Sequence, residues 1–201
     1  MNHNIVIIDE TIQSEHFEFH SPIRIKISEK DALLKTIADG TYAFVDSFSS
    51  RLGLSAKEEK ERFIQLGKLL SNRGMSFKQV EGSYKGEISH SSYFIPKPQS
   101  ISEKIFRRLI FKLGKIFDQE SVVLSTAGNV ELVFTTGKNS GRSFRGRGYK
   151  LDSNENYSII KCDCELGNRC KNSIKIGEYN LDQSNLTGVL DDFKDLIFLS
   201  K

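Results

Sequence analysis

The sequence predicts an α+β domain in which one antiparallel sheet carries two helices on one face. Two observations support this prediction. Between residues 41 and 137, segments typical of strands and helices follow one another in the order β-α-β-β-α-β, with one extra strand at the end. The strand segments are short and the helices have moderate lengths, as a compact two-layer domain requires. This order is that of the ferredoxin-like arrangement.

The first strand and helix of this core have clear local signals. Residues 41–48 (TYAFVDSF) are rich in aromatic and β-branched side chains, which favours a strand. Ser55 is a suitable N-cap for a helix over residues 56–72, and Gly74 is a suitable C-terminal stop. One face of this predicted helix is apolar and carries Phe63, Leu66, Leu69 and Leu70.

A hairpin, a second helix and two further strands complete the predicted core. Residues 77–84 and 91–95 predict the strands of the hairpin. A helix over residues 102–117 follows, with a serine at or just before its start as the N-cap. Residues 121–125 and 130–135 predict two strands joined by a tight Ala-Gly-Asn turn. The apolar stripe of the second helix comprises Ile105, Leu109, Leu113 and Ile116.

We expect extensions on both sides of this core. Residues 1–40 predict two short strands and a short helix, and their apolar content is too small for independent folding. Residues 138–201 predict a β-hairpin and a terminal helix. The predicted organisation is therefore an N-terminal extension, a ferredoxin-like core over residues 41–137, and a C-terminal extension.

The overall composition narrows the class of protein without identifying a partner. Charged residues make up 27% of the chain, and the formal net charge of +3 is too mild to indicate a polyanionic partner. No stretch approaches the roughly 20 consecutive apolar residues of a membrane span. The first residues lack the basic segment of a signal peptide. With three cysteines, an odd number, we expect a cytoplasmic protein.

The three cysteines could in principle supply thiolates to zinc. Cys162, Cys164 and Cys170 are close in sequence, and alternate residues of a strand point to the same face. However, the spacing lacks the usual C-x-x-C pair, and no histidine is nearby as a fourth ligand. We therefore expect free thiols and no metal site.

A glycine- and arginine-rich segment, GRSFRGRG, offers a candidate contact to nucleic acid. Arg142, Arg145 and Arg147 could bind phosphates, and the phenylalanine among them could stack on a base. A solvated surface loop explains the same residues, because one loop without a wider basic stripe is a weak signal. We favour the solvated loop and keep nucleic-acid binding as an alternative.

The common nucleophile, nucleotide-binding and metallohydrolase motifs are absent from the sequence, but an ordered set of short segments resembles one family. These segments are AFVDSFSS at residues 43–50, Gly-Ser-Tyr at residues 82–84, DQESVV at residues 118–123, and a strand with a glycine turn at residues 130–137. In order and spacing they are similar to the bacteriophage S-adenosylmethionine lyases, formerly called S-adenosylmethionine hydrolases. The resemblance covers residues 41–137, near half of the chain.

This resemblance implies a function. The family forms homotrimers with active sites between subunits, and it cleaves S-adenosylmethionine to methylthioadenosine and homoserine lactone. Depletion of the methyl donor blunts host restriction or a related defence, so the resemblance implies a phage anti-restriction or anti-defence protein acting in the host cytoplasm. We expect no cofactor.

The resemblance also implies where the site lies. The substrate-binding positions that it implies are Ser47, Tyr84, Gln119 and Ser121. The family places a functional glutamate just before its third strand, where this chain has Ser89 or His90, with Glu87 close by. Glu87 and His90 are therefore the candidate catalytic residues. Either one of them takes the role of the glutamate, or the protein binds its ligand without cleaving it.

The reaction implied by the resemblance needs few protein groups. The carboxylate of the substrate attacks its own γ-carbon, and the sulfonium is a good leaving group, so the protein mainly holds a folded conformer and excludes water. A glutamate can anchor the ammonium, and a tyrosine ring can stabilise the sulfonium. Two alternatives stay open. One is a non-enzymatic ferredoxin-like protein that sequesters a small nucleotide or blocks a host defence protein, and the other is the nucleic-acid-binding protein described above.

We predict an oligomer, and a trimer if the resemblance holds. The predicted sheet leaves strand edges unpaired, and such edges tend to pair with another chain. Light scattering at micromolar protein concentration should give three times the chain mass of 22.8 kDa. A mass near that of a single chain would contradict this prediction.

Overall fold

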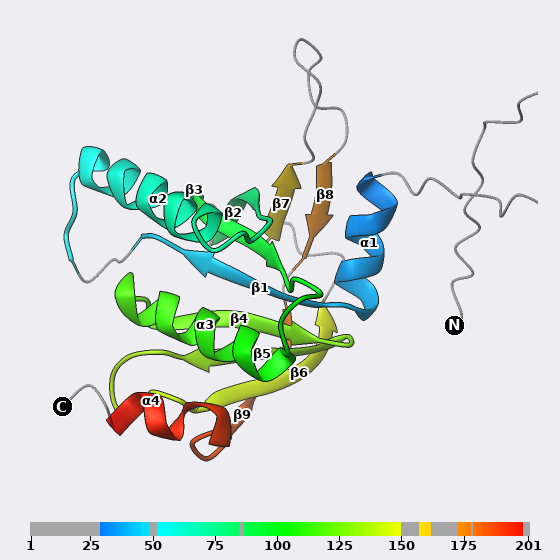
Figure 1. The fold of residues 1–201 in the computed structure, drawn as a ribbon, viewed down its shortest axis with the longest axis vertical. Helices are drawn as coiled ribbons and strands as arrows, with labels where there is room; N and C mark the ends of the chain where they lie inside the picture. Colours follow the sequence, from blue (N-terminus) through cyan, green and yellow to red (C-terminus); the bar gives the residue numbers. More distant parts are fainter. Residues whose placement is uncertain are drawn as a thin grey trace, which may run out of the picture.

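The computed structural model describes residues 29–48, 52–84, 87–149, 157–161, 173–177 and 179–198. Within these residues the chain forms nine strands and several helices (Figure 1). The helices are α1 (Glu29–Asp39), α2 (Ala56–Ser71), α3 (Glu103–Ile116), the 3-10 helix η1 (Asp191–Phe193) and α4 (Lys194–Phe198). The strands are β1 (Thr41–Asp46), β2 (Lys78–Tyr84), β3 (Glu87–Pro96), β4 (Ser121–Thr126), β5 (Asn129–Phe134), β6 (Ser143–Tyr149), β7 (Tyr157–Lys161), β8 (Ser173–Ile176) and β9 (Tyr179–Leu186).

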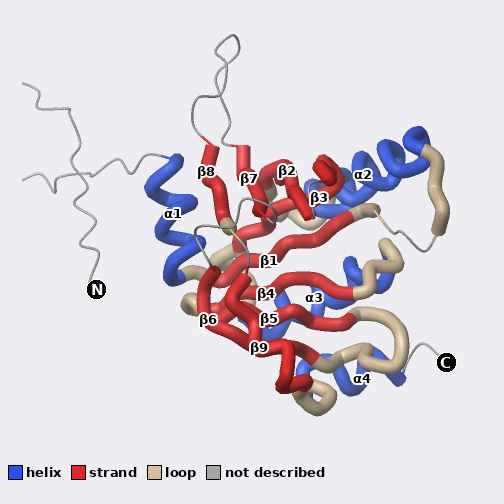
Figure 2. Tube along the Cα trace, turned by 180° about the vertical axis from the view of Figure 1, so that it is seen from behind, coloured by secondary structure: helices blue, strands red, loops and turns tan. Residues whose placement is uncertain are grey.

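All nine strands belong to one antiparallel sheet, in the order β8-β7-β2-β3-β1-β4-β5-β6-β9. The sheet curls towards a half-barrel (Figure 2). In a flat sheet β1 and β9 would lie roughly 19 Å apart, because three strands separate them. Yet the ring centroids of Phe44 on β1 and Tyr179 on β9 are only 6.0 Å apart. The curl thus brings one edge strand back over the middle of the sheet.

The prediction of a ferredoxin-like core with two helices is wrong. The sheet has nine strands rather than the few of that arrangement, because β7 and β8 extend it beyond β2, and β6 and β9 extend it beyond β5. A third helix, α1, packs on the face opposite α2 and α3 through Leu33 and Ile37. The physical reason is that the predicted core would leave unpaired strand edges and an uncovered apolar face. Strands from residues 138–201 pair with those edges, and α1 covers part of that face.

Two apolar layers lie on the two sides of the sheet. The outer layer joins α2, α3, η1 and α4 to one face of the sheet and includes Ala43 and Val45 of β1. The inner layer lies within the curl and includes Tyr42 and Phe44 of the same strand. Because successive residues of a strand point to opposite faces, β1 contributes to both layers and is buried on both sides.

The capping signals of α2 and α3 are confirmed. Ser55 caps α2, and its backbone N–H donates to Glu58 Oε2 at 2.8 Å while Ser55 Oγ accepts from Glu58 N, which makes a capping box. Ser102 caps α3 by accepting a hydrogen bond from Ile105 N. Both helices begin and end within one or two residues of the predicted bounds.

The apolar stripe predicted for α3 is wrong in part. Ile105 and Ile116 are 56% and 57% exposed, whereas the face on the sheet carries Phe106, Ile110, Leu113 and Phe117. The sequence of α3 therefore contains two overlapping apolar stripes, the predicted one and the one that faces the sheet. Both have the spacing of a helical face, so the spacing alone does not distinguish them. Close packing at Gly114 decides between them. A Cβ at this position would lie 2.6 Å from Thr135 Cγ2, so the glycine lets α3 approach the sheet closely.

None of the helices in the described residues is long and apolar enough to cross a membrane.

We predict that Gly114→Ala destabilises the protein more than the matched change in α2, Gly67→Ala. At Gly114 the new methyl group meets Thr135 and Val122 side chains inside the core, and overpacking of this kind costs about 1–3 kcal/mol. At Gly67 it meets the end of the Tyr93 side chain, with the hydroxyl oxygen at 2.9 Å and Cζ at 3.4 Å. The gain in helix propensity of about 1 kcal/mol is common to both changes, and at Gly67 it offsets the contact. Urea unfolding of the two variants tests this order. A larger loss of stability for Gly67→Ala would show that the packing of α3 has been misjudged.

Candidate functional site

The strand register gathers the sequence-predicted site residues at one end of the sheet. Asp46, the last residue of β1, pairs with Ser92 in the middle of β3, so the first half of β3 extends past β1. Phe44 pairs with Val123 near the start of β4. The segment after β1, the end of β2, the start of β3 and the start of β4 therefore lie at the same end. We call this the hairpin end of the sheet; it contains Ser47, the register partners Tyr84 and Glu87, Gln119 and Ser121.

The backbone of the β2–β3 hairpin projects past the last residue of β1. Tyr84 and Glu87 are register partners at its tip, and His90 lies two residues before the partner of Asp46. The side chains of Tyr84, Glu87 and His90 lie outside the described part of the structure. Along β3, His90 therefore lies two residues and Glu87 five residues beyond the level of Asp46, and five residue steps correspond to roughly 17 Å. Both residues lie on the side of the hairpin end, and Glu87 lies well beyond the level of Ser121 in the same chain.

The side chain of Gln119 is buried and bonded to the protein itself. Its Nε2 donates to the carbonyl oxygens of Phe48 at 2.5 Å and of Phe117 at 3.3 Å. Its own backbone carbonyl accepts hydrogen bonds from Thr135 Oγ1 and Thr136 Oγ1, at 2.5 and 3.0 Å. The Nε2 group is therefore committed to holding the chain after β1 against the end of α3. This geometry indicates a positioning role for Gln119.

Ser47 and Ser121 differ in exposure. Ser47 is fully buried, and its carbonyl oxygen accepts a hydrogen bond from Arg62 Nε at 3.0 Å. Ser121, the first residue of β4, is half-buried. Of these two residues, Ser121 is the better placed to meet a ligand.

Sequence reasoning missed Arg62, which ties three elements together at the hairpin end. From α2 it donates to Ser47 O and, through Nη2, to Phe117 O at 2.5 Å. Its guanidinium also lies over the Phe117 ring, 5.4 Å from the centroid. No motif in the sequence marks this arginine, because an isolated cation on an amphipathic helix is normally exposed.

Sequence reasoning also passed over Glu120, which lies between Gln119 and Ser121. Its side chain is exposed at the hairpin end, and its backbone carbonyl accepts a hydrogen bond from Thr135 N at 2.9 Å. Burial of Gln119 on one side of the turn thus leaves the neighbouring carboxylate facing outward. The polar DQES segment is the feature of the sequence that could have indicated this exposed carboxylate. When one polar residue of such a turn is buried, its neighbours often face solvent.

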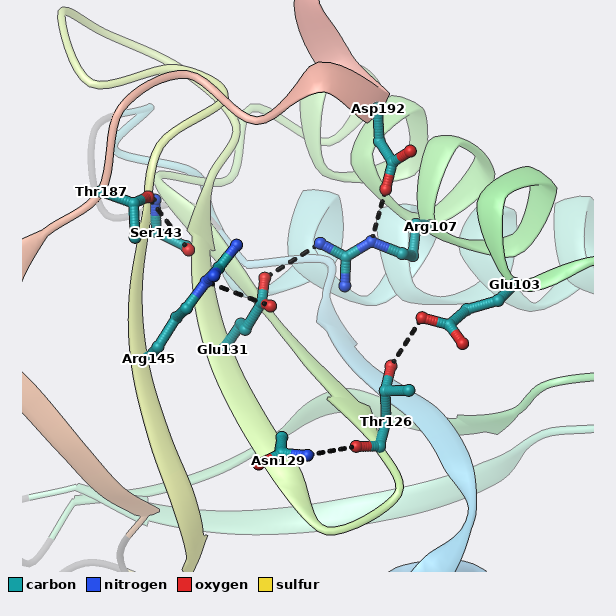
Figure 3. Close-up of polar contacts among 9 residues, drawn as sticks. All are labelled: Glu103, Arg107, Thr126, Asn129, Glu131, Ser143, Arg145, Thr187 and Asp192. Carbon is teal, nitrogen blue, oxygen red and sulfur yellow. Dashed lines mark hydrogen bonds and ion pairs between the residues drawn. The ribbon is translucent and has the colours of Figure 1, made fainter.

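A second polar site lies at the other end of β5, between α3, β5, β6 and η1 (Figure 3). It contains Arg107 of α3, which is buried. Arg107 Nε donates to Asp192 Oδ2 and Nη2 donates to Glu131 Oε2, both at 2.9 Å. Its guanidinium also lies 5.6 Å from the Phe193 ring centroid. The cation therefore fastens η1 and β5 to α3.

The carboxylate partners keep this buried arginine charged. Burial lowers the pKa of Arg107, but the charge of Glu131 and the hydrogen bonds to Glu131 and Asp192 outweigh it, so the pKa is raised overall. Removal of the arginine would leave Asp192 without this cation and Glu131 with only the longer contact to Arg145, at 3.4 Å. The network thus acts as a structural anchor on one wall of the second site.

Two adjoining cavities open next to this network. One, of about 470 Å³, is lined by Glu103, Arg107, Thr126, Asn129, Val130, Glu131, Arg145, Gly146 and Asp192. The other, of about 380 Å³, shares three of these residues and is lined by Asn129, Arg145, Gly146, Arg147, Asp182, Asn185 and Thr187. Together they form a polar groove, which we call the β6 groove.

The structure separates the three arginines of the predicted nucleic-acid segment. Arg145 and Arg147 line the β6 groove, and they lie on one face of β6 because one residue separates them. Arg142 has a structural role instead, since its Nε donates to Thr187 O at 2.7 Å and its Nη1 to Asn139 Oδ1 at 3.4 Å. The segment expected to be a solvated loop is in fact largely a strand, β6, within the sheet.

The described residues contain no group of three or more His, Cys, Asp and Glu side chains that could hold a metal ion. The expectation for Cys162, Cys164 and Cys170 falls outside the described residues.

Comparison with known proteins adds no relative. No protein-family model matches the sequence, and no curated protein matches it either.

We predict that Gln119→Leu destabilises the protein by about 1–3 kcal/mol, because the change leaves the carbonyl group of Phe48 without this donor and removes one of the two side-chain donors to the carbonyl group of Phe117, the other being Arg62. The same substitution at the exposed Gln65 of α2 should change stability by less than about 0.5 kcal/mol. Thermal unfolding followed by circular dichroism measures both variants. Equal effects of the two changes would mean that Gln119 does not hold the hairpin end together.

Proposed function

We propose that the protein is an S-adenosylmethionine lyase, which cleaves S-adenosylmethionine to methylthioadenosine and homoserine lactone. The observation that supports this proposal is the strand register, which gathers residues distant in sequence at the hairpin end. These are residues of the segments that resemble the lyase family. The proposal rests on this convergence together with the resemblance of the sequence.

The proposed reaction balances without a cofactor or a second substrate. One carboxylate oxygen of the substrate attacks its own γ-carbon and forms the ester bond of the lactone. The bond between the γ-carbon and the sulfonium sulfur breaks, and its electron pair stays on sulfur, which leaves as the neutral thioether of methylthioadenosine. The ammonium group keeps its protons throughout. The protein then contributes by folding the substrate and excluding water rather than by proton transfer.

The residues at the hairpin end suit these tasks in different ways. A carboxylate is needed to anchor the substrate ammonium, and Glu87 and Glu120 are the two candidates that the register brings to this end. The ring of Tyr84 would stabilise the sulfonium through its π face. Gln119 and Arg62 would keep the surrounding backbone in place, because their hydrogen bonds run to protein carbonyl groups.

A trimer would complete such a site. In the family that the sequence resembles, active sites lie between subunits, and the projecting β2–β3 hairpin would then reach the Gln119–Ser121 turn of a neighbour. Consumption of the methyl donor would give the protein its anti-restriction role. A protein that only sequesters S-adenosylmethionine would use the same contacts without the attack step.

We predict that the purified protein releases methylthioadenosine from S-adenosylmethionine, and that replacing the anchoring carboxylate lowers the rate at least tenfold. Loss of one charge-assisted hydrogen bond costs about 1.5–3 kcal/mol, which corresponds to that factor or more. Glu87→Gln and Glu120→Gln test the two candidates, and His90→Ala tests the remaining one. Glu61→Gln on the exposed face of α2 is the matched control. Chromatography of the reaction mixture measures the product.

The outcomes separate the alternatives. A defect in one of the glutamate variants, with an unchanged oligomer and control, identifies the anchor. A larger defect in His90→Ala would assign the role of the family glutamate to His90. Binding of S-adenosylmethionine without product would favour the sequestering protein, and the absence of both binding and product would refute the proposal.

A further inference from the structure

The β6 groove exists because of an irregularity in the pairing of β6 with β9. Phe144 pairs with Leu186, and Gly146 pairs with Leu181. Residues 182–185 of β9 therefore stand opposite Arg145 alone. Such a bulge pushes the longer strand out of the ladder and turns its side chains in new directions. Here it places Asp182 and Asn185 in the wall of the 380 Å³ cavity.

Local contacts hold this bulge in a defined shape. Asp182 Oδ1 accepts hydrogen bonds from Ser184 N at 3.1 Å and from Ser184 Oγ at 2.6 Å. At the other side, Gly146 permits a close crossing of the two strands, because a Cβ there would lie 1.7 Å from Asn180 O. A side chain at position 146 would thus push β6 and β9 apart. The strand crossing that shapes the cavity would then be lost.

The two arginines of the groove differ in how far the protein neutralises them. Arg145 contacts Glu131 at 3.4 Å, but the other oxygen of that carboxylate is held by Arg107 at 2.9 Å. The Arg145 side chain is 57% exposed. Arg147 is exposed and makes no ion pair with any residue that the structure describes. The two guanidinium groups flank Gly146, and the one carboxylate that lines the same cavity, that of Asp182, accepts two hydrogen bonds from Ser184.

We propose that the β6 groove binds the phosphate group of a nucleotide, either free or within a single-stranded nucleic acid. Guanidinium groups form paired hydrogen bonds with phosphate oxygens, and two of them lie on one face of β6. The carboxamides of Asn129 and Asn185 line the same cavity, and they can bond to the edges of a base. A volume of about 380 Å³ is within the range of sites for ligands of this size.

This site is separate from the hairpin end. Asn129 and Arg147 are register partners at one end of β5, whereas Phe134 at its other end pairs with Ser121. Five residue steps along a strand correspond to roughly 17 Å. The β6 groove is therefore a second site, and its occupation does not depend on the proposed lyase activity.

The test measures binding of two probes to the full chain at low salt. The probes are adenosine monophosphate, followed by calorimetry, and a fluorescein-labelled oligothymidine, followed by anisotropy. We expect Arg147→Ala to weaken binding at least about tenfold, and Arg147→Lys to weaken it less, because lysine keeps the charge but not the paired donors. Arg73→Ala, an exposed arginine at the end of α2, is the control with the same change in net charge.

The results either support or overturn the proposal. Binding of the oligonucleotide that adenosine monophosphate displaces, with a loss in Arg147→Ala alone, supports a site for one nucleotide. Binding of the oligonucleotide alone, with the same loss, supports a site on a single strand. The proposal is overturned if neither probe binds, or if Arg73→Ala weakens binding as much as Arg147→Ala does.

Discussion

Burial of β1 on both faces is the constraint on which the rest of the structure depends. Its residues Tyr42, Ala43, Phe44 and Val45 are all buried, and they point alternately to the two sides of the sheet. Burial of each large side chain contributes roughly 1.5–3 kcal/mol, so both faces of the sheet must be covered. Helices α2 and α3 cover one face (Figure 1). The other face is covered partly by α1 and partly by the curl of the sheet, which brings Tyr179 against Phe44.

The sequence predicted the elements whose signals are local and failed where the fold depends on distant pairing. The caps Ser55 and Ser102 and the glycine turns lie next to the elements they bound, so α2, α3 and the hairpins could be placed. By contrast, β7 and β8 are short, and β7 pairs with β2, which is far away in the chain. No local sequence pattern indicates that β7 pairs with the free edge of β2, or that β8 then pairs with β7. The predicted N-terminal helix and C-terminal hairpin were therefore assigned to extensions and not to the sheet that they complete.

The same distinction applies to the candidate site residues. That their segments share one end of the sheet could be predicted, because it follows from where strands begin and end, and these limits are encoded by turns. The part-buried Arg62 and the buried Arg107 could not be predicted, because in sequence an arginine that binds carbonyl or carboxylate oxygens resembles one in solvent. Their burial is favourable only when several hydrogen bonds compensate for the lost hydration, and those partners come from other elements.

The strand pair β4–β5 connects the two proposed sites and also explains how they differ. At one end, Thr135 and Gln119 fix the turn that presents Glu120 and Ser121. At the other end, Asn129 and Glu131 form part of the β6 groove. The far wall of that groove, however, belongs to β9 and η1, which are fastened to the core by Arg107 and by the stacking of Phe193 on Phe111. The hairpin end, by contrast, is held by hydrogen bonds between α2, the end of α3 and the chain after β1.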